Sequence, residues 1–186
     1  MRRIIRLALF MIICFLSLVL VGCKKDVTIS DISSKYNKYF ENSVNSCKQV
    51  TLDYSVSDED IVIYDSFVKA KFNNEAIDVS IKESKLNSKY VLESNEESYS
   101  TTSKTRRDFV NVNFNENYIR TFEENEDLKL SIKKFYFCDF IGISDLPINS
   151  ISAVIVKTNN ESIESIVATF VSDSNKDVTI TITFVY

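Results

Sequence analysis

The sequence predicts an α+β domain that is mainly antiparallel β, a curved sheet or half-barrel of about eight strands with an N-terminal helix packed against it. Two changes along the chain carry this prediction. Apolar residues recur at helical spacing over residues 29–44, and from residue 50 they alternate with polar residues, as in half-buried strands. The connections between the expected strands are too short for crossover helices, so neighbouring strands should pair antiparallel.

The expected helix runs from Thr28 to about Ser46. Thr28 and Asp31 have the spacing of a capping box, in which each side chain accepts a hydrogen bond from the other's backbone, while Ser30 is a competing N-cap. The apolar stripe that should face a sheet consists of Ile29, Ile32, Tyr36, Tyr39, Phe40 and Val44.

Strands are expected over residues 50–56, 61–72 and 76–83, with a shorter one over residues 90–93. The polar segment from Ser94 to Arg107 is rich in Ser and Thr and indicates a long mobile hairpin loop. Further strands are expected over residues 108–114 and 118–122, and a three-strand meander over residues 151–158, 163–172 and 178–186.

Residues 128–136 allow two interpretations. Acidic residues over 123–127 and the basic Lys133 and Lys134 match the dipole of a short helix. Leu128, Leu130 and Ile132 alternate with polar residues, which equally favours a strand.

The first 23 residues have the organisation of a secretory signal. Three arginines precede 16 uncharged residues, a run shorter than the roughly 20 that span a bilayer. The junction Leu20-Val21-Gly22-Cys23 then resembles the bacterial lipobox. That resemblance implies a diacylglycerol on the Cys23 sulfur and cleavage before Cys23, whereas an uncleaved signal anchor is the alternative.

Three segments follow from this interpretation: a signal peptide over residues 1–22, acylated Cys23 with a short tether over 23–27, and one β-rich extracytoplasmic domain over 28–186. The protein would be anchored by lipid to the cell membrane, where two acyl chains give stable attachment. Loss of the signal changes the formal net charge from −4 to −7. Neither value gives an electrostatic reason to expect a nucleic-acid partner.

Cys47 and Cys138 would then be the two thiols of an oxidising compartment. A disulfide between them would close a loop of about 90 residues and contribute about 4 to 5 kcal/mol. Two separately buried thiols are the alternative.

The order of elements also carries a resemblance. A lipid anchor, one helix, long antiparallel strands, an irregular aromatic stretch and a closing meander resemble the LolA-like or LppX-like lipoprotein fold, a half-open β-barrel wrapped around a helix. In that family the concave face binds acyl chains or other hydrophobic ligands. The resemblance rests on element order and not on a residue motif, so it transfers no binding residues.

The composition excludes several kinds of chemistry. With no histidine, the chain lacks Ser-His-Asp and Cys-His catalysis and every histidine metal ligand. Two glycines leave no P-loop and no GxGxxG turn. The acidic groups at residues 58–60, 96–97 and 123–127 lack the glycine of a calcium loop, so solvated turns are the alternative to Ca²⁺ binding. We therefore predict no enzyme activity, no cofactor and no metal site.

The sequence favours a non-enzymatic surface lipoprotein that binds or carries a hydrophobic, lipid-like ligand on the concave face of its sheet. An envelope protein-interaction or structural module with a fully packed core is the alternative. Lys104, Arg106 and Arg107 would then contact anionic headgroups or form a solubilising loop tip. The candidate pocket residues, each of which could also be ordinary core, are Tyr54, Phe72, Phe114, Phe122, Phe170 and Phe184.

Overall fold

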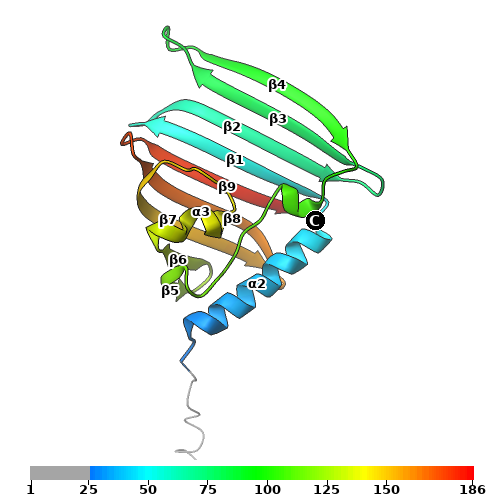
Figure 1. Cartoon of the computed structure of the whole chain (residues 1–186), viewed down its shortest axis with the longest axis vertical. Coiled ribbons are helices and arrows are strands. Elements are labelled where there is room, and N and C mark those ends of the chain that lie inside the picture. The colour runs from blue at the N-terminus through cyan, green and yellow to red at the C-terminus, as the bar shows by residue number, and fades with distance from the viewer. Residues whose placement is uncertain (1–25) are drawn as a thin grey trace, which may run out of the picture.

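The computed structural model describes residues 26–186, so the signal segment, the lipobox-like junction and Cys23 lie outside the described residues. The fold is an open sheet of nine antiparallel strands in the order β4-β3-β2-β1-β9-β8-β7-β6-β5 (Figure 1). This confirms the predicted fold class. The strands are β1 (Gln49–Asp58), β2 (Ile61–Phe72), β3 (Ile77–Leu86), β4 (Leu92–Thr101), β5 (Ile119–Glu124), β6 (Leu128–Ile132), β7 (Ile148–Asn159), β8 (Ser162–Ser172) and β9 (Asp177–Val185).

The long helix α2 (Ile29–Ser46) begins with the predicted capping box. The Asp31 backbone N–H donates to Thr28 Oγ1 at 3.2 Å, and the Thr28 backbone N–H donates to Asp31 Oδ2 at 3.0 Å. Its buried face includes Ile32, Tyr36 and Phe40. The helical period therefore identified both the helix and the face that packs. Within residues 26–186 no helix has the length and hydropathy needed to cross a bilayer.

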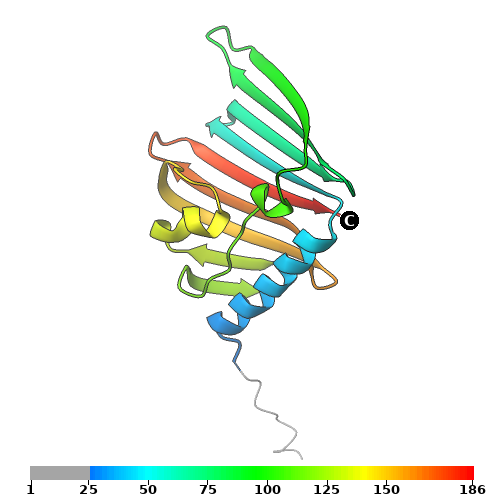
Figure 2. The ribbon, with the colours of Figure 1, turned by 45° about the vertical axis from the view of Figure 1, so that its right-hand side comes forward.

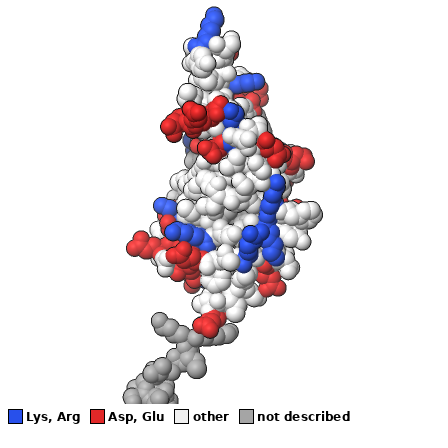
Figure 3. Space-filling view, turned by 90° about the vertical axis from the view of Figure 1, so that its left-hand side faces the viewer, with Lys and Arg blue, Asp and Glu red and all other residues white. Residues whose placement is uncertain are grey.

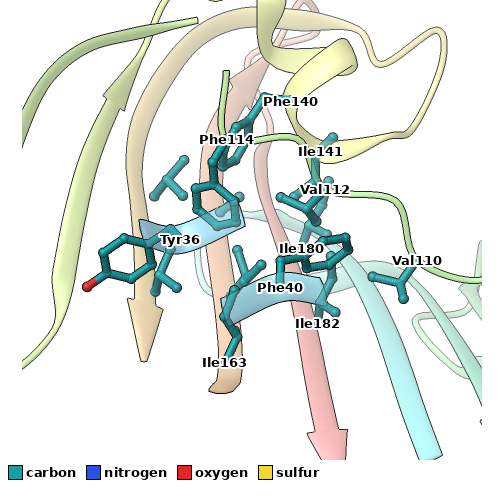
Figure 4. Close-up of a cluster of buried hydrophobic side chains, with 14 of the residues drawn as sticks. Tyr36, Phe40, Val110, Val112, Phe114, Phe140, Ile141, Ile163, Ile180 and Ile182 are labelled. Carbon is teal, nitrogen blue, oxygen red and sulfur yellow. The ribbon is translucent and has the colours of Figure 1, made fainter. Parts of the chain in front are cut away.

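One face of the sheet, the inner face, carries a second layer over only half its width. The covering layer consists of α2, the coil over residues 109–118, and the short helices η1 (Arg106–Asp108), η2 (Lys134–Tyr136) and α3 (Phe137–Ile141). Figures 1 and 2 show this layer in front of β5–β9, while β1–β4 extend beyond it. Figure 4 shows the core between the layers, where Phe40 and Phe114 meet Ile163 and Ile180.

The structure corrects two expectations for the middle of the chain and decides between two interpretations of a third segment. Residues 92–101 form strand β4, paired with β3 over ten residues, because the edge of β3 offers backbone hydrogen bonds even to a segment whose polar composition indicates a loop. Residues 128–132 form strand β6, so of the two interpretations the strand is right. Strand β4 is polar and has no apolar period, whereas β6 is short and its alternation alone did not exclude a helix.

The segment over residues 109–114 is a coil, although it was expected to be a strand. Its alternation is real, since Val110, Val112 and Phe114 are buried. Its backbone, however, bonds to the covering layer: the Asn113 N–H donates to the Phe140 carbonyl at 2.9 Å, and the Phe114 N–H donates to Asn37 Oδ1 at 3.1 Å. An alternating pattern predicts which side chains are buried. It does not by itself predict a strand, because a strand also needs a neighbouring strand that satisfies its backbone hydrogen bonds.

Candidate functional site

The inner face of the sheet stays apolar beyond the edge of the covering layer. On β9 its side chains are 0–3% exposed beneath that layer: Val178, Ile180, Ile182 and Phe184. Strand β1 continues the same rows, because Leu52 pairs with Ile182 and Tyr54 pairs with Ile180. Leu52 and Tyr54 are nevertheless only partly buried, because they lie where the covering layer ends and β1–β4 extend beyond it (Figure 1).

We call the partly exposed apolar side chains on the inner face of β1–β3 the open strip. One of its rows crosses three strands, with Leu52 opposite Val68 and Val68 opposite Ile81. A second contact joins the rings of Tyr54 and Tyr64, whose centroids lie 6.1 Å apart in an edge-to-face arrangement. The members of the open strip are Leu52, Tyr54, Val56, Tyr64, Val68 and Ile81.

A small hollow lies where the open strip meets the covering layer. Its volume is about 160 Å³. Leu52 and Ile182 line it from the sheet, and Phe109, Val110 and Ile141 line it from the covering layer. Its polar lining residues are Arg107, Asp108 and Asn111. The hollow therefore connects the open strip with the edge of the packed core.

The open strip is uncharged and is bordered by charged residues. Burial, with a smaller effect from Tyr64, raises the pKa of Tyr54 above its usual value of 10.0, so its hydroxyl stays neutral at physiological pH. Toward the β4 edge the rows end in charged residues, with Glu97 opposite Ile81 and Lys85 opposite Tyr64. An apolar strip with a polar border can bind a chain that has an apolar body and a polar end.

The six aromatic residues expected to line a pocket lie in different places. Tyr54 belongs to the open strip, and Phe72 lies at its end, where its ring packs against Phe109 at 6.4 Å between centroids. Phe122 lies on β5 at the opposite edge of the sheet. The other three are core residues with 0–3% exposure: Phe114, Phe170 and Phe184.

The remaining members of the open strip were not singled out from the sequence. Their alternation did place them on the apolar face of their strands, as for Leu52 and Val68. No periodic signal shows which strands the covering layer leaves open, because that depends on where residues 106–118 and 134–143 fold back.

Two of the three basic residues at the end of the expected loop, Arg106 and Arg107, contact α2. The Arg106 guanidinium donates to the Val44 carbonyl at 2.9 Å and to the Asn45 carbonyl at 3.2 Å, and also to the Cys47 carbonyl. It therefore caps a helix that has no basic residue in its own last turn. Arg107 pairs with Glu41 on the same helix. Arg106 is thus a structural capping residue and not a loop tip.

Cys47 and Cys138 are both free cysteines. Cys47 is buried at the C-terminal end of α2, and Cys138 is partly exposed in α3. Burial raises the pKa of the Cys47 thiol, although the nearby Arg106 opposes this effect. Within the part of the chain that is described, no group of three or more Cys, Asp or Glu residues is arranged to hold a metal ion.

Comparisons with known proteins give no family for this chain. A scan against protein-family models and a search of curated proteins both found no match. The geometry of the open strip is therefore the feature from which a function can be inferred.

Proposed function

We propose that this protein is a non-enzymatic lipoprotein, anchored at the extracytoplasmic face of the cell membrane, that binds a hydrophobic, lipid-like ligand on the open strip. The observation that carries the proposal is the continuation of the apolar rows from β9 to β3 past the covering layer. Covering exposed apolar surface contributes about 25 cal/mol per Å². A ligand that lies along the strip would gain this free energy.

The shape of the site favours an extended acyl chain over a compact molecule. The hollow of about 160 Å³ is smaller than the roughly 300–1,000 Å³ of sites that enclose a drug-sized ligand. It has room for one end of a chain, and the row from Leu52 to Ile81 would contact the rest. The charged border at Lys85 and Glu97 would remain beside the polar end of the ligand.

The lipid anchor would hold the site close to a source of such ligands. From Cys23 to Thr28 the chain reaches at most about 17 Å. Mass spectrometry of the protein from its own cells tests the anchor. A diacylglycerol on Cys23, absent from the C23S variant, supports it, and an unmodified Cys23 contradicts it.

Binding of a fluorescent sixteen-carbon fatty acid tests the site. Val68 and Lys69 are neighbours on β2 whose side chains point to opposite faces of the sheet. V68Q therefore places a glutamine within the open strip, and K69Q places the same side chain on the opposite face. We expect V68Q to weaken binding about tenfold, which corresponds to about 1.4 kcal/mol of lost apolar contact. K69Q should bind like the wild type. Equal binding by both variants, or no binding by the wild type, contradicts the proposal.

One observation favours the second candidate, an envelope protein-interaction module. Strand β4 is a ten-residue sheet edge with no proline, no lysine and no bulge in its pairing with β3. Such an edge can accept an extended segment of a partner as an additional strand. Photo-crosslinking on whole cells tests it, with a crosslinker at Ser98 on β4 and a control at the exposed Ser152 on β7. A discrete product only at Ser98 supports this function, and no product at Ser98 counts against it.

A further inference from the structure

The turn between β3 and β4 exposes three consecutive apolar side chains. Tyr90 is 80% exposed, Val91 55% and Leu92 46%. They lie at the end of the long axis opposite to the start of α2 (Figure 1). Beside them Lys89 is exposed, and Figure 3 shows a basic side chain at the extreme of this narrow end, with acidic side chains further down. We call residues 89–92 the apolar tip.

The turn holds the apolar tip in one defined conformation. Asn87 Oδ1 accepts hydrogen bonds from the backbone N–H groups of Lys89 at 2.8 Å and Val91 at 3.0 Å. The Asn87 carbonyl accepts from the Tyr90 N–H at 3.0 Å, and the Asn87 N–H donates to the Val91 carbonyl at 2.9 Å. The exposure of Tyr90 and Val91 is therefore part of an ordered turn.

Tyr90 occupies a backbone conformation that its residue type disfavours. Its φ is +58°, in the left-handed region where a hairpin turn normally has Gly or Asn. Among the described non-glycine residues with positive φ, Tyr90 is the only apolar one; the others are Glu59, Asp145, Asn160, Glu161 and Asn175. Folding gains little from an aromatic ring that is strained and exposed. Such a combination indicates a contact outside the fold.

We infer that the apolar tip inserts into the interface of a phospholipid bilayer, with Lys89 beside anionic headgroups. Three side chains are too few for a stable protein interface, which needs about 800 Å² on each partner. Shallow insertion of an aromatic and two aliphatic side chains needs no such area, and a tyrosine ring suits the boundary between headgroups and acyl chains. A lysine near an anionic surface adds about 1 kcal/mol of attraction.

This inference rests on the proposed lipid anchor, which keeps the tip at a high local concentration beside the membrane. The anchored end and the apolar tip lie at opposite ends of the long axis (Figure 1). Contact of both ends with one bilayer would lay the molecule along the membrane surface. The open strip would then lie within reach of the lipids that it is proposed to bind.

Tryptophan fluorescence tests the insertion, because the chain contains no tryptophan of its own. The Y90W variant places a single tryptophan at the tip, and F135W is the matched control at another exposed aromatic residue, 86% exposed on η2. The full lipidated chain is reconstituted into vesicles of phosphatidylcholine and phosphatidylglycerol, with and without brominated acyl chains. We expect brominated lipid to quench Y90W several-fold more strongly than F135W, with a shift of Y90W emission to shorter wavelength.

Equal quenching of Y90W and F135W on vesicle-bound protein overturns the inference and leaves the lipid anchor standing. A chain that does not float with the vesicles contradicts both. V91W is a second reporter, for which we expect the same quenching. Y90G tests the strain directly: its thermal midpoint should equal or exceed that of the wild type, and a lowered midpoint would show that the Tyr90 ring serves the fold.

Discussion

Replacing Ser43 by alanine should destabilise the protein far more than its small size suggests. Ser43 is fully buried in α2, where it joins the helix to the sheet. Its Oγ accepts a hydrogen bond from the Ile163 N–H of β8 at 2.6 Å and from the Tyr186 hydroxyl at 2.8 Å, and donates to the Tyr39 carbonyl at 2.8 Å. In S43A the Ile163 N–H has no partner at a position with 0% exposure.

The magnitude follows from two opposing effects. A buried N–H without a partner costs about 1–3 kcal/mol. Alanine in place of serine within a helix returns about 0.5 kcal/mol. We therefore expect S43A to lower the free energy of unfolding by about 0.5–2.5 kcal/mol, and the thermal midpoint by about 2–4 °C for each kcal/mol.

Urea unfolding followed by circular dichroism measures this change, and S46A is the control. Ser46 lies on the same helix, is exposed, and donates only to the Asn42 carbonyl at 2.6 Å. S46A should be neutral or slightly stabilising, with the same dependence on urea concentration. If S43A is no more destabilising than S46A, the buried Ser43–Ile163 hydrogen bond does not stabilise the packing of the helix on the sheet.

Three further changes test other parts of the structure. R106M retains apolar contact with its neighbours but removes the charged cap of α2, and urea unfolding should show a loss of about 1.5–3 kcal/mol. R107M removes an exposed ion pair with Glu41, a hydrogen bond to Asn111 and a contact with the Phe40 ring, but no helix cap; a loss in R106M below that in R107M would contradict the capping role. G142A places a Cβ 2.0 Å from the Asn111 carbonyl oxygen, at a φ of +72°. Thermal unfolding should therefore show that the free energy of unfolding falls by at least about 1–3 kcal/mol. An unchanged thermal midpoint would show that the Asn111 carbonyl does not lie this close to Gly142. Burial and the adjacent Asp65 raise the pKa of Asp53, so the wild type loses stability as pH rises through that pKa. D53N has no such charge and should be more stable than the wild type at pH 7. This advantage should disappear below about pH 4, where Asp53 is protonated in the folded and the unfolded protein. Equal stabilisation at both pH values would contradict the electrostatic cause.

The helical and the two-residue repeats of apolar residues in the sequence predicted the long helix and most of the long strands. The helix, the long strand β2 and the C-terminal meander were expected within a few residues of their observed bounds. In the helix and the meander one face is buried against a neighbouring layer, so the repeat of the sequence matches the repeat of the structure. In β2 the same alternation marks an inner face that is only partly buried.

The covering layer could not be predicted in the same way. Val110, Val112 and Phe114 are buried, and the backbone of their segment is held by Phe140 and Asn37, which are distant in sequence. Arg106 caps a helix that ended 60 residues earlier, and its position in a Ser- and Thr-rich segment gave no sign of this contact. The open strip was missed for the same reason, since its exposure depends on where that layer ends.

The central claim is that the open strip holds a lipid-like ligand, and native mass spectrometry of the protein purified from its own cells tests it most directly. The wild type and K69Q should each carry a bound lipid of discrete mass beyond the covalent anchor, and V68Q should carry markedly less. A wild-type protein free of non-covalent lipid, or V68Q with the same occupancy as the wild type, would contradict the claim.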